Sequence, residues 1–238
     1  MSELTIVSIY PDLLGTYGDA GNVLALRHRA ALHDVDVDVL AIAPGEAIPA
    51  SADLYVLGGG EDSAQTAAAR GIRADGNLMI AADRGASVLA ICAGYQLLGE
   101  HFPDATGQPA EGLGIIDITT DRLPTRAVGE LAADPLSAGL PRLTGYENHG
   151  GATHLGPDVQ PLAQVRAGVG NGDGTEGAVS GHVVGTYLHG PGLARNPALA
   201  DLLLGWCVGR VLEPIEEPEV EALREERLRS VLGENWNR

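Results

Sequence analysis

Lysine is missing from this sequence, because all 15 basic residues are arginine. Without lysine the chain has no residue for Schiff-base chemistry, no lysine general base and no lysine for a phosphate-binding P-loop. We therefore expect any ATP-dependent step to belong to another polypeptide. The abundance of alanine, glycine, valine and arginine indicates a GC-rich genome, which explains the missing lysine without removing its chemical consequence.

The sequence also has no excess of positive charge, no long apolar run and no pattern of a secretory leader at its start. The 238 residues carry a formal net charge of −17, whereas a nucleic-acid-binding protein needs basic residues to displace counterions from phosphates. No apolar run approaches the roughly 18 residues of a membrane-spanning helix, and residues 1–4 contain no basic segment leading into an apolar one. We therefore expect a cytoplasmic protein without nucleic acid partner or transmembrane segment, in which the two cysteines stay reduced.

The first half of the chain alternates strand-like and helix-like segments. This alternation predicts an α/β fold with a mostly parallel sheet flanked by helices, and at this length we expect a single domain, residues 1–238. Past residue 110 most segments are strand-like, so the sheet is expected to be mixed. The expected strands are 5–10, 35–40, 54–57, 86–91, 115–120, 144–147, 163–166 and 178–188, and the expected helices are 20–32, 197–209 and a C-terminal helix at about 217–232.

Cys92 stands where the apolar strand 86–91 meets a segment rich in small residues. A cysteine at this kind of turn is typical of a nucleophile elbow. The positive end of the following helix would favour thiolate, and the Ala93 N–H would lie where an oxyanion forms. A free cysteine after apolar residues is also a common core residue. That second interpretation suits Cys207, which lies in a predicted helix without a glycine elbow.

His189 is the histidine best placed to act as a base for Cys92. It ends an apolar strand just before a Gly-Pro pair breaks the chain, a position from which side chains project into a cleft. His182 has the opposite parity on that strand and is expected to be structural or exposed. The spacing of His149 and His154 fits no helix-borne metal-binding pair, and the glycines between them predict a loop, so no metal site is expected.

A glycine triplet, 58–60, follows one of the expected strands. It lacks the G-x-G-x-x-G spacing of a dinucleotide-binding loop. We expect the Gly59 and Gly60 N–H groups to complete an oxyanion hole opposite Ala93, the alternative being a flexible strand-to-helix turn. Asp19 precedes the expected helix 20–32 and is a plausible N-cap there.

Five stretches of the sequence resemble the class I, triad-type glutamine amidotransferases. The segments around Cys92 and His189 are typical of the whole superfamily. Those at 9–22 and 145–149 indicate the CobB/CobQ-like branch, and within it the glutaminase subunits of lipid II isoglutaminyl synthase. The five stretches follow one another along almost the whole chain, at 9–22, 58–62, 90–96, 145–149 and 185–191.

The resemblance implies a flavodoxin-like fold with Cys92 as nucleophile and His189 as general base and then acid. It also implies that Arg126 holds the α-carboxylate of L-glutamine through a bidentate guanidinium pair, the alternative being a solvated surface arginine. Many family members carry a glutamate two residues after the histidine, where this chain has Pro191. The third triad member therefore stays unassigned, with another residue or the backbone as the alternatives that could orient His189. Helix capping explains Asp19 without a functional role.

The resemblance further implies a subunit that works with a second polypeptide. The implied partner is a Mur-ligase-like (MurT-type) subunit in a heterodimer, which would bind ATP and lipid II and use the ammonia to amidate the α-carboxyl of D-glutamate in the peptidoglycan stem peptide. No cofactor is expected in the present chain. Two alternatives stay open, namely a glutaminase for another acceptor such as a cobyric acid-type substrate, and a non-catalytic ligand-binding regulator.

Overall fold

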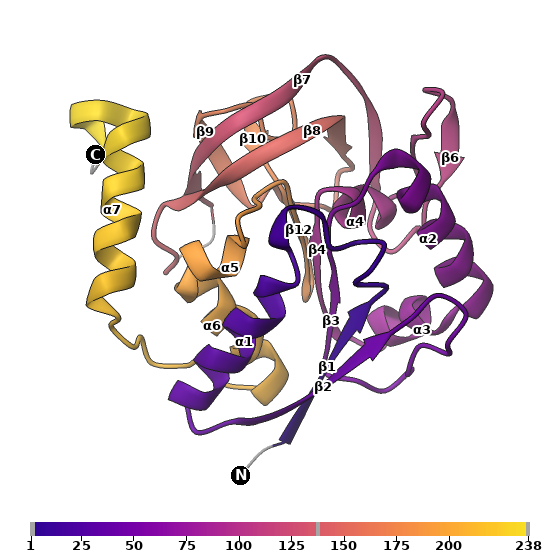
Figure 1. The fold of residues 1–238 in the computed structure, drawn as a ribbon, viewed down its shortest axis with the longest axis horizontal. Helices are drawn as coiled ribbons and strands as arrows, with labels where there is room; N and C mark the ends of the chain where they lie inside the picture. The colour runs from indigo at the N-terminus through magenta and orange to yellow at the C-terminus, as the bar shows by residue number, and fades with distance from the viewer. Residues whose placement is uncertain (1–2, 137–138, 237–238) are drawn as a thin grey trace.

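A six-stranded, mostly parallel sheet forms the centre of the molecule (Figure 1). The computed structural model describes residues 3–136 and 139–236 of the predicted domain 1–238. Met1 and Ser2, part of the segment considered for a leader, lie outside the described residues. Only the edge strand β11 is antiparallel to its neighbour. The strand order is β11 (Ala178–Ser180), β12 (Val183–Thr186), β4 (Ser87–Ile91), β3 (Leu54–Leu57), β1 (Glu3–Ile9) and β2 (Asp36–Ile42).

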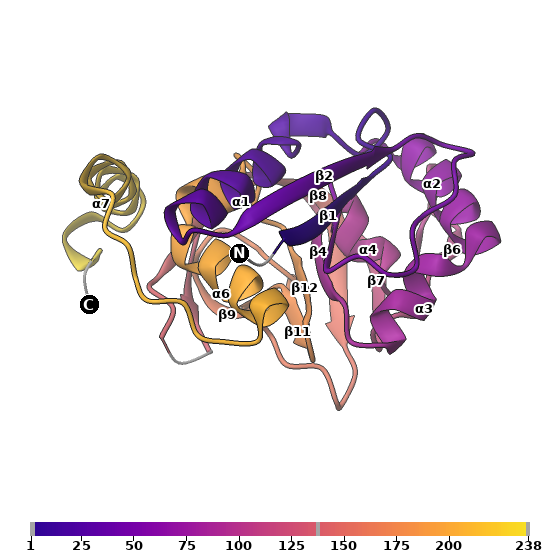
Figure 2. The same cartoon turned by 90° about the horizontal axis from the view of Figure 1, so that it is seen from below.

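Helices cover this sheet on both sides, which is why β3, β4 and β12 are buried at every position. Figure 2 shows α1 (Gly21–Leu32) and α6 (Pro197–Val208) on one side, and α2 (Asp62–Asp75) and α3 (Asn77–Asp83) on the other. α2 and α3 are additional to the helices expected from the sequence. Short elements near the carboxyl ends of the strands are η1 (Thr16–Gly18), α4 (Ala93–Leu97) and α5 (Gly192–Arg195).

The expected strands between residues 115 and 166 lie in a second sheet, whereas the expected strand 178–188 divides into β11 and β12 of the first. The longest members of the second sheet, β7 (Ile118–Pro135) and β8 (Leu143–Leu155), are antiparallel neighbours. β8 includes residues 149–154, so the loop predicted there is wrong. A Cβ on Gly151 would lie 2.3 Å from Gln96 Nε2 and 2.7 Å from Tyr187 Oη, so this glycine serves close packing rather than a turn. The other strands are β5 (His101–Pro103), β6 (Pro109–Glu111), β9 (Ala163–Ala167) and β10 (Thr175–Glu176).

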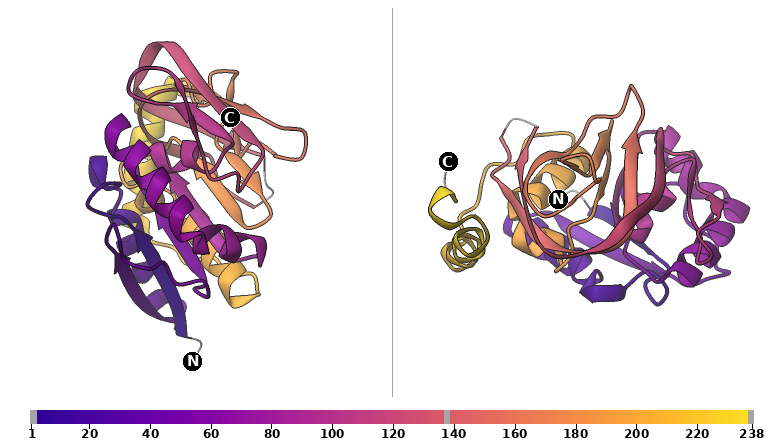
Figure 3. Two further views of the ribbon diagram at one scale, coloured as in Figure 1. Left: turned by 90° about the vertical axis from the view of Figure 1, so that its right-hand side faces the viewer. Right: turned by 90° about the horizontal axis from the view of Figure 1, so that it is seen from above.

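The C-terminal helix α7 (Pro218–Leu232), followed by η2 (Gly233–Asn235), forms one end of the molecule (Figure 3). It is anchored by the buried Arg224, which donates to the carbonyls of Arg195 and Arg142 and to Asn196 Oδ1. No helix in the described ranges is long and apolar enough to cross a membrane.

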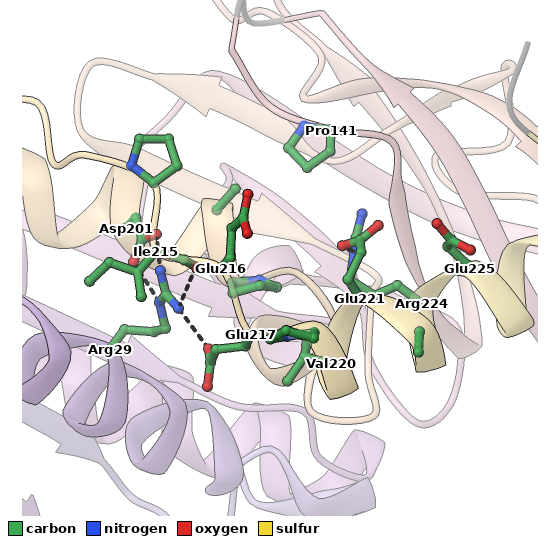
Figure 4. A pocket seen from close by; sticks show the side chains of 15 residues that line it. Arg29, Pro141, Asp201, Ile215, Glu216, Glu217, Val220, Glu221, Arg224 and Glu225 are labelled. Carbon is green, nitrogen blue, oxygen red and sulfur yellow. Dashed lines mark hydrogen bonds and ion pairs between the residues drawn. The ribbon is translucent and has the colours of Figure 1, made fainter.

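A cavity of about 610 Å³ lies beside the segment that leads into α7. Figure 4 shows Arg29 at its wall, where the guanidinium reaches Asp201 Oδ2 at 2.5 Å and Glu217 Oε2 at 2.6 Å. This arginine therefore joins α1, α6 and the start of α7. None of the site residues predicted from the sequence lines this cavity.

Candidate active site

Cys92 occupies a sharp turn between β4 and α4, as the sequence predicts. Its φ of 51° and ψ of −105° lie in a region that non-glycine residues rarely adopt. The Cys92 N–H donates to the Thr186 carbonyl at 2.8 Å, which ties the turn to the end of β12. A Cβ on Gly94 would lie 2.9 Å from the Gly58 carbonyl oxygen. Small residues therefore let the chain turn here and hold Cys92, a residue that is only 7% exposed, in a fixed place.

His189 lies beyond the end of β12, and its side chain is fully buried. Two backbone hydrogen bonds with Tyr146 of β8, at 2.8 and 3.1 Å, hold its main chain. A Cβ built on Gly59 would lie 2.7 Å from His189 Cε1 and 3.3 Å from Cys92 Cβ. The imidazole and the cysteine thus flank the same glycine. His189 Nε2 is buried and has no hydrogen-bond partner among the described residues.

Asp19 holds the other ring nitrogen of His189, which the sequence analysis missed. Both carboxylate oxygens lie 3.0 Å from His189 Nδ1, and Oδ2 also accepts the Gly59 N–H at 2.7 Å. The predicted N-cap role of Asp19 is wrong, because helix α1 begins after Ala20 with no side-chain cap. Since β1, β4 and β12 are parallel, their carboxyl ends share one edge of the sheet. That shared edge was the signal that could have found Asp19.

Pro191 stands where the family resemblance implies a glutamate, and the structure gives this proline a packing role. A Cβ on Gly21 would lie only 2.3 Å from Pro191 Cγ. The proline therefore fills the contact between the start of α1 and the start of α5. The ring of His189 is instead oriented by Asp19, which lies in the segment that follows β1 near the start of the chain.

The surroundings of His189 favour its protonated form. Burial disfavours charge on the ring, but the hydrogen bond that the ring donates to Asp19 and the negative charges of Cys92 and Asp19 outweigh it and raise the pKa of His189 to about 10. At neutral pH the ring is then an imidazolium next to Cys92. Cys207 differs, because burial raises its pKa to about 11 and keeps it a neutral thiol.

The predicted oxyanion donors separate into two groups. The Gly59 N–H is engaged by Asp19, so it is not free to bind an oxyanion in this structure. Gly60 follows it in the chain, and Ala93 is the first residue of α4, where a helix leaves its N–H groups without intrahelical acceptors. Gly60 and Ala93 therefore remain the predicted donors.

Arg126 reaches the site through Asn148. Arg126 lies where the pairing of β7 with β8 is irregular, between Arg122 and Ala127. Its Nε donates to Asn148 Oδ1 at 2.6 Å and its Nη2 to the Asn148 carbonyl at 3.1 Å. The same carbonyl oxygen lies 4.0 Å from Cys92 Sγ. The structure thus brings Arg126 to the cysteine, through a residue that the sequence analysis did not single out.

The three other histidines considered from the sequence, His149, His154 and His182, have structural partners. His149 Nε2 lies 3.3 Å from Glu147 Oε2, and its ring stacks on Tyr187. His154 pairs with an aspartate across the strand, and His182 is exposed and stacks on a tryptophan ring, as expected for a structural or exposed residue. Within residues 3–136 and 139–236, no group of three or more His, Cys, Asp or Glu side chains is arranged to hold a metal ion.

Comparison of the sequence with known protein families identifies the family of this chain. A family model for the CobB/CobQ-like glutamine amidotransferase domain matches residues 5–197. The chain belongs to this family and is a glutamine amidotransferase, as predicted.

Three relatives show which members of the family this chain resembles in sequence and in length. The chain is 36% identical over 242 residues to the GatD subunit of lipid II isoglutaminyl synthase (glutamine-hydrolyzing) from Staphylococcus aureus, covering 100% of this chain and 98% of that protein. Its counterpart from Streptococcus pneumoniae is 34% identical over 83% of this chain and 78% of that protein. A cobyric acid synthase from Sphingopyxis alaskensis is 36% identical over 71% of this chain, but only 34% of that protein is covered.

Solved structures confirm the predicted fold class. A glutamine amidotransferase crystal structure superposes with a TM-score of 0.59 at 19% identity, covering 85% of this chain and 98% of the other. A second, from Thermotoga maritima, gives a TM-score of 0.54 at 16% identity over 98% of this chain and 90% of the other. At these identities the likeness concerns the fold.

Proposed function

We propose that this chain is the glutaminase subunit of a lipid II isoglutaminyl synthase and that it hydrolyses L-glutamine to glutamate and ammonia at Cys92. The observation that carries the proposal is the buried Asp19–His189 pair beside Cys92. The acceptor is suggested by the match to GatD over 98% of that protein, against 34% of a cobyric acid synthase. Retention of a complete Cys-His-Asp set argues against a non-catalytic regulator.

The chemistry follows from the positions of these groups. The Cys92 thiolate attacks the side-chain amide carbon of glutamine, and the oxyanion accepts hydrogen bonds from the Gly60 and Ala93 N–H groups. His189 gives its Nε2 proton to the departing amide nitrogen, which leaves as ammonia, and a glutamyl thioester remains. Arg126 pairs with the α-carboxylate of the substrate.

Asp19 makes the second half of the reaction possible by holding the ring of His189. Forming the thioester removes the thiolate charge of Cys92, which is one of the charges that raise the pKa of His189. The ring can then act as a base and take a proton from water. The hydroxide attacks the thioester, glutamate leaves and the thiolate is restored. Asp19 keeps Nδ1 protonated throughout, so Nε2 is the atom that exchanges protons.

The ammonia serves a second polypeptide in this proposal. A Mur-ligase-like (MurT-type) partner would bind ATP and lipid II and amidate the α-carboxyl of D-glutamate in the stem peptide. The lack of lysine in this chain agrees with nucleotide chemistry on another subunit. We expect the two subunits to form a heterodimer that shelters ammonia from protonation in bulk water.

Co-expression with the candidate partner tests the proposal. The purified complex, given glutamine, ATP and lipid II, should release glutamate and yield lipid II with one carboxyl converted to an amide, measured by mass spectrometry. Cys92→Ala should abolish both products with glutamine as the nitrogen source, and Cys207→Ala should leave both unchanged. Full glutamine-dependent turnover by Cys92→Ala would overturn the catalytic assignment. Co-purification with a cobyric acid-type synthetase instead would overturn the acceptor while retaining the glutaminase.

A further inference from the structure

Asn148 of β8 contacts three parts of the active site at once. Its carboxamide oxygen accepts from Arg126 Nε at 2.6 Å, and its Nδ2 donates to Tyr17 Oη at 2.6 Å. Its carbonyl oxygen accepts from Arg126 Nη2 at 3.1 Å and lies 4.0 Å from Cys92 Sγ. One residue therefore stands between the arginine and the nucleophile.

The backbone around Asn148 is held firmly by its neighbours in β8. The buried carboxylate of Glu147 accepts the N–H groups of Val169 at 2.8 Å and Gly170 at 3.0 Å. The ring of His149 stacks on a buried tyrosine, with centroids 3.6 Å apart. Because side chains alternate along a strand, burial of the two flanking residues directs Asn148 to the opposite face. Asn148 is thus pre-organised before any substrate binds.

The orientation of the Asn148 carboxamide follows from its partners. Arg126 has only donors, so it requires the oxygen, and the Tyr17 hydroxyl accepts from the nitrogen on the other side. Tyr17 is itself held in place at a positive φ of 60°, with its ring edge-to-face with His189 at 5.1 Å. The amide is therefore locked in one of its two flips.

This arrangement uses one edge of the Arg126 guanidinium and leaves another for a ligand. Asn148 takes the edge formed by Nε and Nη2. The end formed by Nη1 and the second N–H of Nη2 keeps the fork geometry that pairs with a carboxylate. The Asn148 carbonyl oxygen also lies close to Cys92 Sγ. Asn148 therefore sets the distance between the carboxylate-binding end of Arg126 and the sulfur.

We propose that Asn148 is the positioning residue that orients Arg126 and sets its spacing from Cys92, and that it thereby selects glutamine over the one-methylene-shorter asparagine. The inference rests on the proposed glutaminase function and names a specificity determinant of that same site. Arg126 fixes the flip of the Asn148 amide, and Tyr17 supports it by accepting from Asn148 Nδ2.

Two electrophiles separate recognition from thiol reactivity in the full-length chain. The glutamine analogue 6-diazo-5-oxo-norleucine carries the α-carboxylate, whereas iodoacetamide does not. Peptide mass spectrometry follows labelling of Cys92 in wild type, Asn148→Ala and Asn148→Asp. The matched control is Asn77→Ala. It also removes one side-chain hydrogen bond, of 2.8 Å to the Ile48 carbonyl, but neither residue belongs to the active site.

Loss of Asn148 should slow labelling by the glutamine analogue about tenfold or more, the effect of a lost hydrogen bond to a charged group, and leave the iodoacetamide rate unchanged. Asn148→Asp keeps the shape of the side chain but pairs with Arg126 and competes with the substrate carboxylate, so its loss should be larger. Asn77→Ala should match wild type with both reagents. Equal slowing by both reagents, or no slowing by either, would overturn the inference.

Substrate choice gives a second readout. In the active complex, Asn148→Ala should raise KM for glutamine more than it lowers kcat and should reduce the ratio of glutamine to asparagine turnover. Because Asn148 acts through Arg126, the double variant with Arg126→Ala should be no worse than Arg126→Ala alone. An unchanged substrate ratio, or additive losses, would overturn the role of Asn148. Wild-type Cys92 that resists the glutamine analogue would instead overturn the proposed glutaminase.

Discussion

Replacing Asp19 by asparagine tests the central contact of the site with minimal change in shape. In the wild type, Asp19 Oδ2 accepts from Gly59 N–H at 2.7 Å while both oxygens face His189 Nδ1 at 3.0 Å. Asparagine has one side-chain oxygen. The Gly59 N–H can only donate, so this oxygen will accept from Gly59. The new NH₂ group then faces Nδ1 and requires it to be an acceptor. The substitution therefore favours the neutral tautomer with its proton on Nε2.

The size of the effect follows from the His189 pKa. Its rise from the ordinary value of 6.5 to about 10 corresponds to about 5 kcal/mol of preference for the charged ring, since a tenfold change in acidity is worth about 1.4 kcal/mol. Cys92 supplies part of this preference, so Asp19→Asn removes part of it. We expect glutamine turnover to fall by about 10²–10⁴-fold, as when the aspartate of a serine-protease triad is replaced by asparagine.

Stability should change with pH in a defined direction. A group whose pKa is raised on folding binds more protons in the native than in the unfolded state between the two pKa values, so stability falls as pH rises there. For His189 the contribution is full below pH 6.5 and is lost as pH rises through about 10. Asp19→Asn lowers the pKa of His189 in the folded state. The variant should therefore lose less stability than the wild type between pH 6.5 and about 10.

The assays are glutamate release by the purified enzyme complex and urea unfolding of the full chain at several pH values. At pH 6 we expect the variant to be about 2–3 kcal/mol less stable, below the usual cost of breaking a buried ion pair because His189 can lose its proton. Wild-type turnover together with an unchanged pH dependence of stability would refute the assignment of Asp19.

Three further tests, two of them with a paired control substitution, have defined outcomes. Cys92→Ala should abolish labelling by 6-diazo-5-oxo-norleucine and Cys207→Ala should not, as peptide mass spectrometry will show; labelling that moves with Cys207 would contradict the site. Gly59→Ala places a Cβ 2.7 Å from the imidazole and should cost about 1–3 kcal/mol in calorimetry, whereas Gly150→Ala, with nothing within 4 Å, should be neutral. Arg224→Ala should destabilise the chain by about 3 kcal/mol and speed hydrogen exchange in α7; unchanged exchange there would argue against the anchor.

Local sequence was enough to predict the turn at Cys92 and the position of His189 beyond the end of a strand. The strand before Cys92 and the small residues after it predict an elbow, because a sharp turn requires small neighbours and an apolar strand to hold it. His189 follows from the end of an apolar strand. The fold class follows from alternating strands and helices, since parallel strands need helical crossovers. These features depend on residues close together in the chain, which is why they were predictable.

Tertiary structure alone decided which groups complete the site. Asp19 is separated from His189 by most of the chain, and its position before a helix favoured the wrong N-cap interpretation. The two glycines after His149 favoured a loop, but both lie within strand β8, where Gly151 allows close packing against Gln96 and Tyr187. That strand brings Asn148 to Arg126 and Cys92. Contacts between distant segments depend on how two sheets pack, and no local pattern in the sequence encodes that distance.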